Sequence, residues 1–260
     1  TKRYGIGDAE QVALDGIDLT INKGEFIAIM GPSGCGKTTL LNILGLLDRP
    51  DEGTYHLGSK SVTNISSSRS AKIRNEKIGF VFQFPERQLF AQTVREDLAF
   101  GPQNLGWSQE KINKSIRKAL ETVQLSPAIL EQSPFSLSGG QKRRVAIAGV
   151  LAMNPEVLIL DEPTSSLTFN ETETLFELIE KLKTEGVGIL YITHRLTEVF
   201  KIATDIIIMR DGKISLSGKT QDFTNDMLIQ ALLPDGTNME DLRNHDDGRV
   251  IDRTVEPILS

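Results

Sequence analysis

The sequence predicts an α/β fold in which helices cover both faces of a mainly parallel sheet. Short continuous apolar runs recur along the chain, as expected for buried parallel strands, and they alternate with segments of helical periodicity. A glycine-rich loop ending in Gly-Lys-Thr joins the run from Phe26 to Met30 to the start of an apolar helix. The chain has 260 residues, which is ample length for a packed domain of this class.

The individual elements follow from the apolar pattern. Strands are expected over residues 13–21, 26–30, 78–82, 157–160, 188–193 and 205–209. Two helices are expected where apolar side chains share one face, at Ile112, Ile116, Ala119, Leu120 and Val123 and at Leu175, Leu178, Ile179 and Leu182. Gly186 follows the second group and is the type of residue that ends a helix.

Two segments depart from the strand–helix alternation. From about Phe84 to Ser138 there are helical patterns but no convincing buried strand, so we expect a helical insertion in the core. Beyond Leu233 the chain becomes polar and acidic, which predicts a loosely packed tail over residues 233–260. The main domain is therefore expected to span residues 1–232.

Composition disfavours several classes of protein. The net charge of -6 argues against a sequence-independent nucleic-acid binder, and the cluster Lys142-Arg143-Arg144 is expected to be a solvated helix face. No apolar run is long enough to span a bilayer, and we expect no signal peptide. Cys35 is the only cysteine, so no internal disulfide can form and the sequence suits a reducing cytoplasm.

The stretch from Gly31 to Thr38 matches the complete phosphate-binding pattern G-x4-G-K-[ST]. Its glycines allow backbone N–H groups to point at a polyphosphate, and the helix that follows adds its positive dipole end. Lys37 is expected to reach the β- and γ-phosphates, and the Thr38 hydroxyl to bind Mg²⁺. A glycine-rich turn with a chance lysine is the alternative, which the strand–loop–helix context disfavours. The expected nucleotide-binding residues here are Gly31, Pro32, Ser33, Gly34, Cys35, Gly36, Lys37, Thr38 and Thr39.

The strand from Val157 to Leu160 ends in two adjacent carboxylates, Asp161 and Glu162. A strand of this kind can lie next to the phosphate-loop strand and deliver both carboxylates to the same edge of the sheet. Asp161 would then hold Mg²⁺ through water, and Glu162 would polarise the attacking water, because hydrolysis depends mainly on positioning and charge. A strand ending in Asp-Glu is weak evidence alone, but beside a phosphate loop it indicates nucleotide hydrolysis.

A second glycine motif, Leu137-Ser138-Gly139-Gly140-Gln141, stands shortly before the carboxylate strand. Serine followed by two glycines at a helix start can bind an anion, although the same residues can simply cap a helix. Since one ATP already has its phosphate loop, a second anion site indicates the γ-phosphate of a nucleotide on another protomer.

Together these motifs resemble those of the ATP-binding-cassette (ABC) ATPases, in family order from Thr1 to about Leu232. The resemblance implies a P-loop NTPase fold of the ABC type, with a RecA-like core, an antiparallel β-subdomain and an inserted helical subdomain. It implies that Tyr4 stacks on adenine, that Gln83 is the Q-loop glutamine that senses Mg²⁺ and the membrane partner, and that His194 is the switch histidine. Taken singly, Tyr4 could instead be a surface aromatic, Gln83 a polar residue at the end of a strand, and His194 a neighbour of a helix N-cap. The D-loop would be Ser165-Ser166-Leu167-Thr168, with Thr168 where most of the family has Asp.

Different parts of the chain resemble different branches of that family. Residues from Tyr4 to about Phe82 are similar to the lipoprotein-release and macrolide-export ATPases. Residues 82–90, 99–102 and 141–149 are similar to the energy-coupling-factor ATPases, and residues from Asp161 onward to the sugar-import ATPases. This pattern indicates a recombined or engineered mosaic or a divergent lineage.

The resemblance implies an enzyme, the ATP-hydrolysing subunit of a membrane transporter, peripheral on the cytoplasmic face of the membrane. ATP and Mg²⁺ would bind between two protomers, with the phosphate loop, Asp161, Glu162 and His194 from one and residues 138–141 from the other. The alternatives are a soluble ABC ATPase of translation or DNA maintenance, which the acidic charge disfavours, and a cassette that binds ATP with little catalysis. No nucleic-acid partner is expected.

The family also implies where a transmembrane subunit docks, namely in a groove between the core and the helical insertion. The segment after Gln83, from Phe84 to Pro102, would line this groove and is the part most similar to energy-coupling-factor ATPases. We therefore expect a transmembrane partner of the energy-coupling type, in contact with Phe84, Arg87, Leu89 and Phe90.

Overall fold

The computed structural model describes residues 1–5, 7–165 and 167–233 of the protein. Ser166 of the expected D-loop therefore lies outside the described residues, as does the expected tail beyond Leu233. Within the described part of the chain, no helix has the length and apolar character needed to cross a bilayer.

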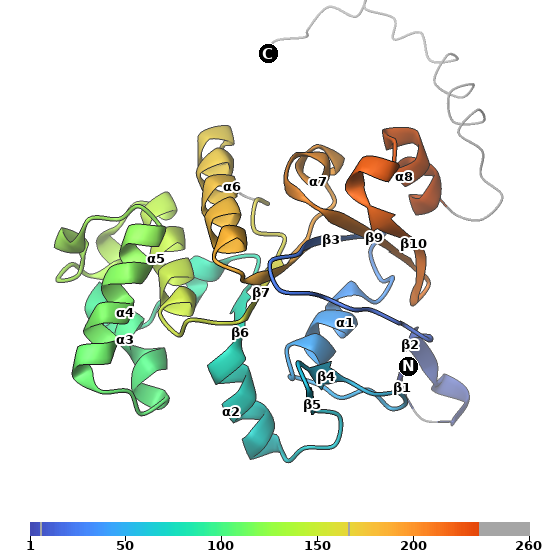
Figure 1. The fold of residues 1–260 in the computed structure, drawn as a ribbon, viewed down its shortest axis with the longest axis horizontal. Coiled ribbons are helices and arrows are strands. Elements are labelled where there is room, and N and C mark those ends of the chain that lie inside the picture. The colour runs from blue at the N-terminus through green and yellow to red at the C-terminus, as the bar shows by residue number, and fades with distance from the viewer. Residues whose placement is uncertain (6, 166, 234–260) are drawn as a thin grey trace, which may run out of the picture.

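A six-stranded sheet with the order β10-β9-β3-β8-β7-β6 lies at the centre of the molecule (Figure 1). Its strands are β3 (Phe26–Met30), β6 (Ile78–Val81), β7 (Val157–Asp161), β8 (Gly188–Ile192), β9 (Asp205–Arg210) and β10 (Lys213–Lys219). Neighbouring strands pair in parallel except at the edge, where β10 is antiparallel to β9. Five of the six predicted strands are thus confirmed, each to within one residue at either end.

The sixth predicted strand, over residues 13–21, is wrong for most of its length. The structure has β2 (Gln11–Leu14), which pairs antiparallel with β1 (Lys2–Tyr4) and then ends. Asp15 donates its backbone N–H to the carbonyl oxygen of Gly212, and Gly16 then turns the chain with a φ of 62°. The apolar residues that follow pack against the core without forming a described strand. A second antiparallel hairpin is formed by β4 (His56–Leu57) and β5 (Lys60–Ser61).

Helices cover both faces of the sheet, as the continuous apolar strands predict. In Figure 1, α1 (Lys37–Leu44) and α2 (Ser67–Lys77) lie below the sheet, and α6 (Phe169–Thr184), α7 (Leu196–Ile202) and α8 (Asn225–Leu232) lie above it. Alternate residues of β3 face two separate apolar cores: Phe26, Ala28 and Met30 belong to one, and Ile27 and Ile29 to the other. Because β3 is buried on both sides, the loop that follows it starts from a rigid position.

The described residues from Phe84 to Ser138 are helical or irregular and contain no strand. They form α3 (Val94–Asn104), α4 (Gln109–Thr122) and the short 3₁₀ turns Pro85–Gln88, Pro127–Ile129 and Pro134–Ser136. The next helix, α5 (Gly139–Leu151), packs with them at the left of Figure 1. Apolar side chains of α4 and α5 share one continuous core with the sheet, so the helical layer is attached to the sheet through α5.

Candidate functional site

The phosphate loop connects β3 to α1 and is shaped by glycines. Gly34 and Gly36 have φ values of 81° and 101°, in the left-handed region that favours glycine. A Cβ atom on Gly36 would lie 2.5 Å from the carbonyl oxygen of Ala13, so no larger residue fits there. No side chain caps the N-terminus of α1, which leaves the first N–H groups of that helix able to bind an anion.

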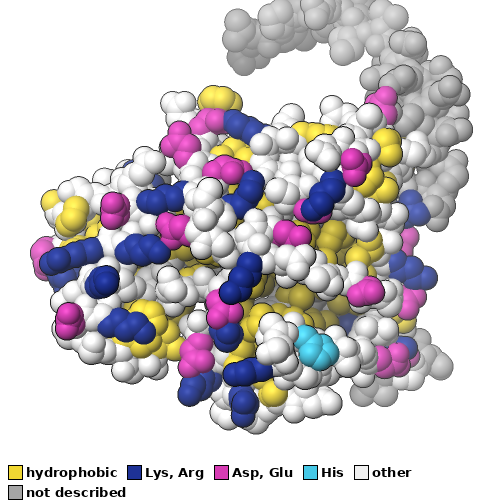
Figure 2. Space-filling model, in the orientation of Figure 1, with side chains coloured by type: hydrophobic (Ala, Val, Ile, Leu, Met, Phe, Trp, Pro, Cys, Tyr) yellow, Lys and Arg dark blue, Asp and Glu magenta, His cyan; other side chains and the backbone are white. Residues whose placement is uncertain are grey.

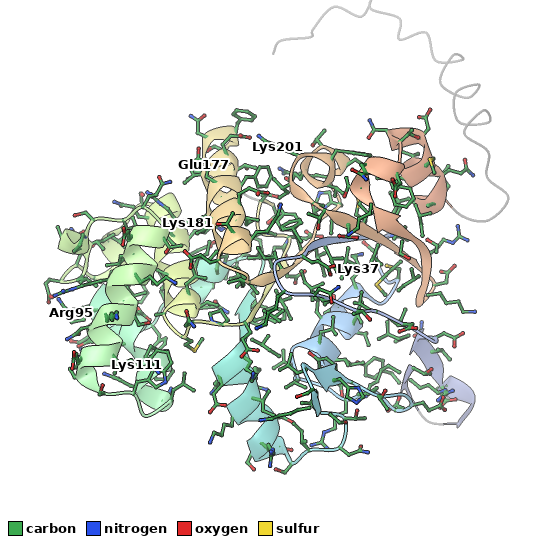
Figure 3. All side chains as sticks on the ribbon, in the orientation of Figure 1. Lys37, Arg95, Lys111, Glu177, Lys181 and Lys201 are labelled. Atoms are coloured by element: carbon green, nitrogen blue, oxygen red, sulfur yellow. The ribbon has the colours of Figure 1, made fainter. Side chains whose placement is uncertain are left out.

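Lys37 lies at the mouth of this loop, at the start of α1 (Figure 3). Its Nζ donates hydrogen bonds to the carbonyl oxygens of Gly31 and Pro32, both at 2.8 Å. Cys35 is buried beneath the loop, with its Sγ 3.7 Å from the same nitrogen. The lysine thus holds the loop together and keeps a positive charge where the sequence predicts a polyphosphate.

Tyr4 lies beside the phosphate loop. A shallow cavity of about 490 Å³ is lined by Tyr4 together with Gly34, Gly36, Lys37, Thr38 and Thr39. The Tyr4 side chain is 44% exposed, and its hydroxyl donates to Asp48 Oδ2 at 3.0 Å. An accessible aromatic ring at one end and an anion-binding loop at the other match the shape of a nucleoside polyphosphate.

Gln83, Glu162 and His194 come together at one edge of the sheet. Gln83 Nε2 donates to Glu162 Oε2 at 3.1 Å, and His194 Nδ1 lies 3.5 Å from Glu162 Oε1. The three residues follow β6, β7 and β8, which are adjacent and parallel, so their carboxyl ends meet at the same edge. The structure thus brings these three expected site residues together.

Glu162 is held in an unusual backbone conformation. Its φ of 44° lies in the left-handed region, which costs about 1–3 kcal/mol for a residue with a side chain. Its N–H donates to the carbonyl oxygen of Ile192 at 3.0 Å, which ties the end of β7 to the end of β8. The sheet edge thereby compensates for the strain and directs the carboxylate between Gln83 and His194.

Asp161, the last residue of β7, is half-buried. Burial and the neighbouring Glu162 charge raise the pKa of Asp161, and Lys37 opposes that shift. The expectation that β7 lies next to the phosphate-loop strand is wrong, because β8 lies between β3 and β7. The acid pair still reaches the site because all three strands end at the same edge.

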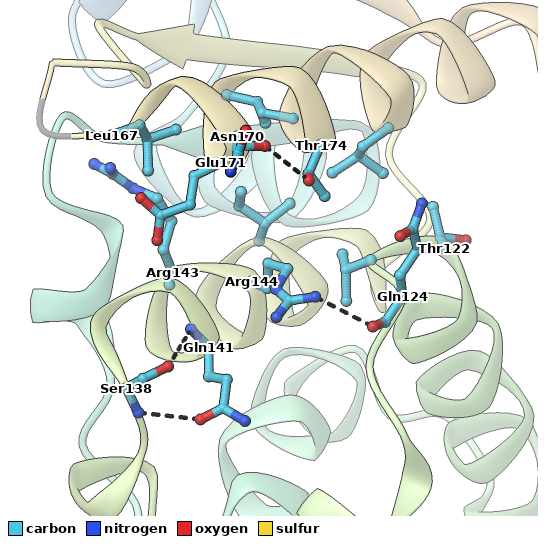
Figure 4. Close-up of a pocket in the computed structure, with 15 residues that line it drawn as sticks. Thr122, Gln124, Ser138, Gln141, Arg143, Arg144, Leu167, Asn170, Glu171 and Thr174 are labelled. Atoms are coloured by element: carbon cyan, nitrogen blue, oxygen red, sulfur yellow. Dashed lines mark hydrogen bonds between the residues drawn. The ribbon is translucent and has the colours of Figure 1, made fainter.

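The second glycine motif, which we call the signature motif, caps α5, the signature helix. Ser138 Oγ accepts the N–H of Gln141 at 3.3 Å, and Gln141 Oε1 accepts the N–H of Ser138 at 3.1 Å (Figure 4). Leu137 is buried beneath this cap. A Cβ atom on Gly139 would meet nothing within 4 Å, whereas one on Gly140 would lie 2.4 Å from Glu171 Oε1. The motif lines a cavity of about 270 Å³ between α5 and α6 and shares no lining residue with the phosphate-loop cavity.

Two buried charges near the site were missed by the sequence analysis. The expected solvated face at Lys142-Arg143-Arg144 is wrong for Arg143, which is 5% exposed. Residues 145–148 of α5 are all buried, so this helix is covered on several sides and not along one stripe. The apolar run directly after the basic cluster is the signal that this part of α5 lies in the interior.

Glu198, on α7, is the second of these buried charges, at 5% exposure. One of its oxygens accepts the hydroxyls of Tyr191 at 2.8 Å and Thr193 at 2.9 Å, and the other accepts the hydroxyl of Thr164 at 2.8 Å. Arg195 Nη1 donates to this second oxygen, Oε1, at 3.3 Å. Glu198 therefore connects the segment after Glu162 to the segment that carries His194. An acidic residue beside buried Val199 in a short apolar helix is the pattern that indicates it.

The fold and the phosphate loop define this protein as a P-loop nucleoside triphosphatase. Residues 14–165 match the family model described as ABC transporter. The chain belongs to the ABC transporter family. It is an ATPase of the class that powers membrane transporters.

Relatives and solved structures agree with this assignment. The chain is 44% identical over 216 residues to the energy-coupling factor transporter ATP-binding protein EcfA2 of Latilactobacillus sakei, covering 83% of this chain and 74% of the relative. It is 44% identical over 214 residues to the protein of the same name from Enterococcus faecalis, covering 82% and 74%.

Among solved structures, cbiO1 from Clostridium perfringens, part of the ABC transporter complex cbiONQ, has a TM-score of 0.77 and 31% identity. That match covers 95% of this chain and 96% of cbiO1. A dimeric ATP-binding cassette in a post-hydrolysis state with ADP and Pi has a TM-score of 0.75 and 34% identity, covering 85% and 97%.

Proposed function

We propose that the chain is the ATP-hydrolysing subunit of an energy-coupling-type membrane transporter and acts as one of two ATPase protomers. The observation that carries this proposal is the group formed by Gln83, Glu162 and His194 at the sheet edge next to the phosphate loop. In this proposal Glu162 polarises the attacking water, and His194 contacts the γ-phosphate. Tyr4 stacks on adenine, and residues Gly31 to Thr39 bind the phosphates.

Mg²⁺ is the metal that the donor set suits. Thr38, Gln83 and Asp161 offer a hydroxyl, an amide oxygen and one carboxylate, which are the hard oxygen ligands that Mg²⁺ combines with substrate phosphates. Within the described residues, no group of three or more His, Cys, Asp or Glu side chains could hold a metal ion alone. The metal would therefore enter with ATP and neutralise phosphate charge.

A second protomer would complete the site. We propose that Ser138, Gly139, Gly140 and Gln141 face the γ-phosphate bound to the partner, whereas the expected contact by Leu137 is replaced by a supporting role, because Leu137 is buried in the main core. Support comes from Gly139, whose Cα faces open space at the N-terminus of α5, and from the separation of this motif from the phosphate-loop cavity of its own chain. The energy-coupling-factor relatives and the dimeric cassette also support a paired ATPase.

ATP should therefore drive dimerisation. In a Glu162→Gln background, sedimentation should show a monomer without nucleotide and a dimer with ATP. Adding Gly139→Asp should abolish the dimer, because a carboxylate would repel the partner's phosphate while it suits the N-terminus of α5 and meets open space in its own chain. A monomer at saturating ATP and high protein concentration, or a dimer unaffected by Gly139→Asp, would contradict the shared site.

The proposed docking surface for a transmembrane partner is a groove between α2, α3 and α5. It has a volume of about 260 Å³ and is lined in part by Asn75, Phe90, Phe100 and Met153. The Phe90 and Phe100 rings meet edge to face at 4.9 Å and are 60% and 49% exposed. Paired exposed aromatic rings beside a groove are typical of a protein-binding surface.

Leu89 also lines this groove, but it is 9% exposed and belongs to the main core, so it offers a docked partner less surface than Phe90 does. Arg87 is exposed and stacks on the Phe84 ring, with its guanidinium carbon 4.5 Å from the ring centroid. Arg87 and Phe90 are therefore the better positions to test.

Arg87→Glu combined with Phe90→Asp should abolish co-purification with a transmembrane component of the energy-coupling type, while basal ATPase activity is retained. Charge reversal and loss of an exposed ring disrupt a contact surface without emptying the core. The matched control is Arg117→Glu with Met227→Asp, which makes similar changes at exposed positions of α4 and α8 and should leave the complex intact. Capture of a sugar-permease or lipoprotein-release subunit instead would contradict the choice of partner.

We propose that residues 1–232 form the ATPase domain, with the helical subdomain inserted at about 84–138, peripheral on the inner face of the membrane. On the face in Figure 2, acidic and basic side chains are interspersed, which favours a protein partner over nucleic acid. A soluble ABC ATPase would capture no membrane component, and a cassette without catalysis would bind ATP but release no phosphate.

A further inference from the structure

Arg143 is a buried cation that the proposed roles leave unused. It is the fifth residue of α5, two residues after the glutamine of the signature motif, and it is 5% exposed. Burial lowers the pKa of its guanidinium, because the charged form loses hydration. A charge in this position is tolerated only when polar groups are arranged around it.

The segment that follows β6 supplies part of that arrangement. Arg143 Nη2 donates to the backbone carbonyl oxygen of Gln83 at 2.7 Å, and Nε lies 3.8 Å from Glu86 Oε2. The Gln83 side chain, in turn, donates to Glu162 Oε2 at 3.1 Å. Gln83 is therefore held at both ends, by α5 through its backbone and by the proposed catalytic carboxylate through its amide.

The start of α6 supplies the other part. Figure 4 shows the Arg143 side chain extending from α5 toward Glu171 and Leu167. Hydrogen bonds from the N–H and hydroxyl of Thr168 lower the pKa of Glu171 most, and the charges of Arg143 and Arg144 lower it further. The same carboxylate lies against Gly140 of the signature motif. One guanidinium thus lies between the segment after Gln83, the signature helix and the helix that follows Glu162.

We propose that Arg143 is a positioning residue for ATP hydrolysis. It fixes the backbone of Gln83 relative to the signature helix and thereby sets how the Gln83 amide meets Glu162. A hydrogen bond from a buried charged donor is costly to break. We therefore expect the segment that carries Gln83 and α5 to move together as one unit. This inference rests on the proposed function, because it assumes that Gln83 and Glu162 act in hydrolysis.

The experiment is a double-mutant cycle of Arg143→Met and Gln83→Ala, measured as kcat and as ATP affinity at saturating Mg²⁺. Arg143→Met should lower kcat roughly tenfold or more with less than about a threefold change in ATP affinity, since it removes positioning and not a phosphate contact. In the Gln83→Ala background the same substitution should add little further loss, because the group that Arg143 positions is already gone.

Two further variants make the test specific. Lys142→Met removes the same charge from the preceding position of α5 and should leave kcat unchanged. Arg143→Lys keeps the charge but lacks the planar fork, so it should restore part of the lost kcat, and it replaces Arg143→Met in the cycle if that variant does not fold. The inference would be overturned if the fold losses of kcat in the two single variants multiplied in the double variant. It would also be overturned if Arg143→Met had the kcat of the wild type. A wild-type chain that hydrolyses no ATP would instead overturn the proposed function.

Discussion

Replacing Glu162 with glutamine should slow ATP hydrolysis on the order of a hundredfold or more while ATP binding is retained. Glutamine has nearly the same shape and can still form hydrogen bonds with Gln83 and His194, but it lacks the negative charge that we propose polarises the attacking water. Since the side chain differs by one atom, the strained backbone at φ 44° has no new steric conflict.

The measurement is phosphate release at saturating MgATP, with ATP retention on a filter as the binding assay. Glu177→Gln is the matched control, because it makes the same substitution at an exposed position of α6 (Figure 3) and should turn over like the wild type. Full turnover by the Glu162→Gln variant would show that another group activates the water.

Lys37→Ala should weaken ATP binding itself, by roughly one to two orders of magnitude, the value of a charged hydrogen bond of about 1.5–3 kcal/mol. The substitution removes the positive charge expected at the β- and γ-phosphates. It also removes both hydrogen bonds to the carbonyl oxygens of Gly31 and Pro32, so the loop should lose order before ATP arrives. Binding and hydrolysis should therefore fall together, unlike the response to Glu162→Gln.

Equilibrium binding of a fluorescent ATP analogue measures this effect. Lys181→Ala serves as control, because Lys181 is exposed on α6 and labelled in Figure 3. The decisive comparison is between the two lysines at equal protein concentration. Unchanged affinity in Lys37→Ala would contradict the role of the phosphate loop, since no other described residue of that cavity is a lysine or arginine.

Local sequence was sufficient for much of the candidate site. The phosphate loop was predictable because its conformation depends on glycines at fixed positions, and the strand at Phe26–Met30 because it is apolar on both faces. The acid pair was predictable because it directly follows an apolar strand. The predicted strand over residues 13–21 shows where prediction from local sequence stops working. Ile17, Leu19 and Ile21 alternate with the period of a strand, but Gly16 turns the chain away from β1.

Sequence alone therefore determined the class of protein, the phosphate loop and the positions of Gln83, Glu162 and His194 along the chain. Only the tertiary structure decided that β8 lies between β3 and β7, and that Gln83 meets Glu162 across 79 residues of sequence. It alone placed Arg143 and Glu198 in the interior, each among groups from other segments. The physical reason is that backbone conformation and apolar period act over a few residues, whereas strand order and the partners of a buried charge depend on packing between distant segments.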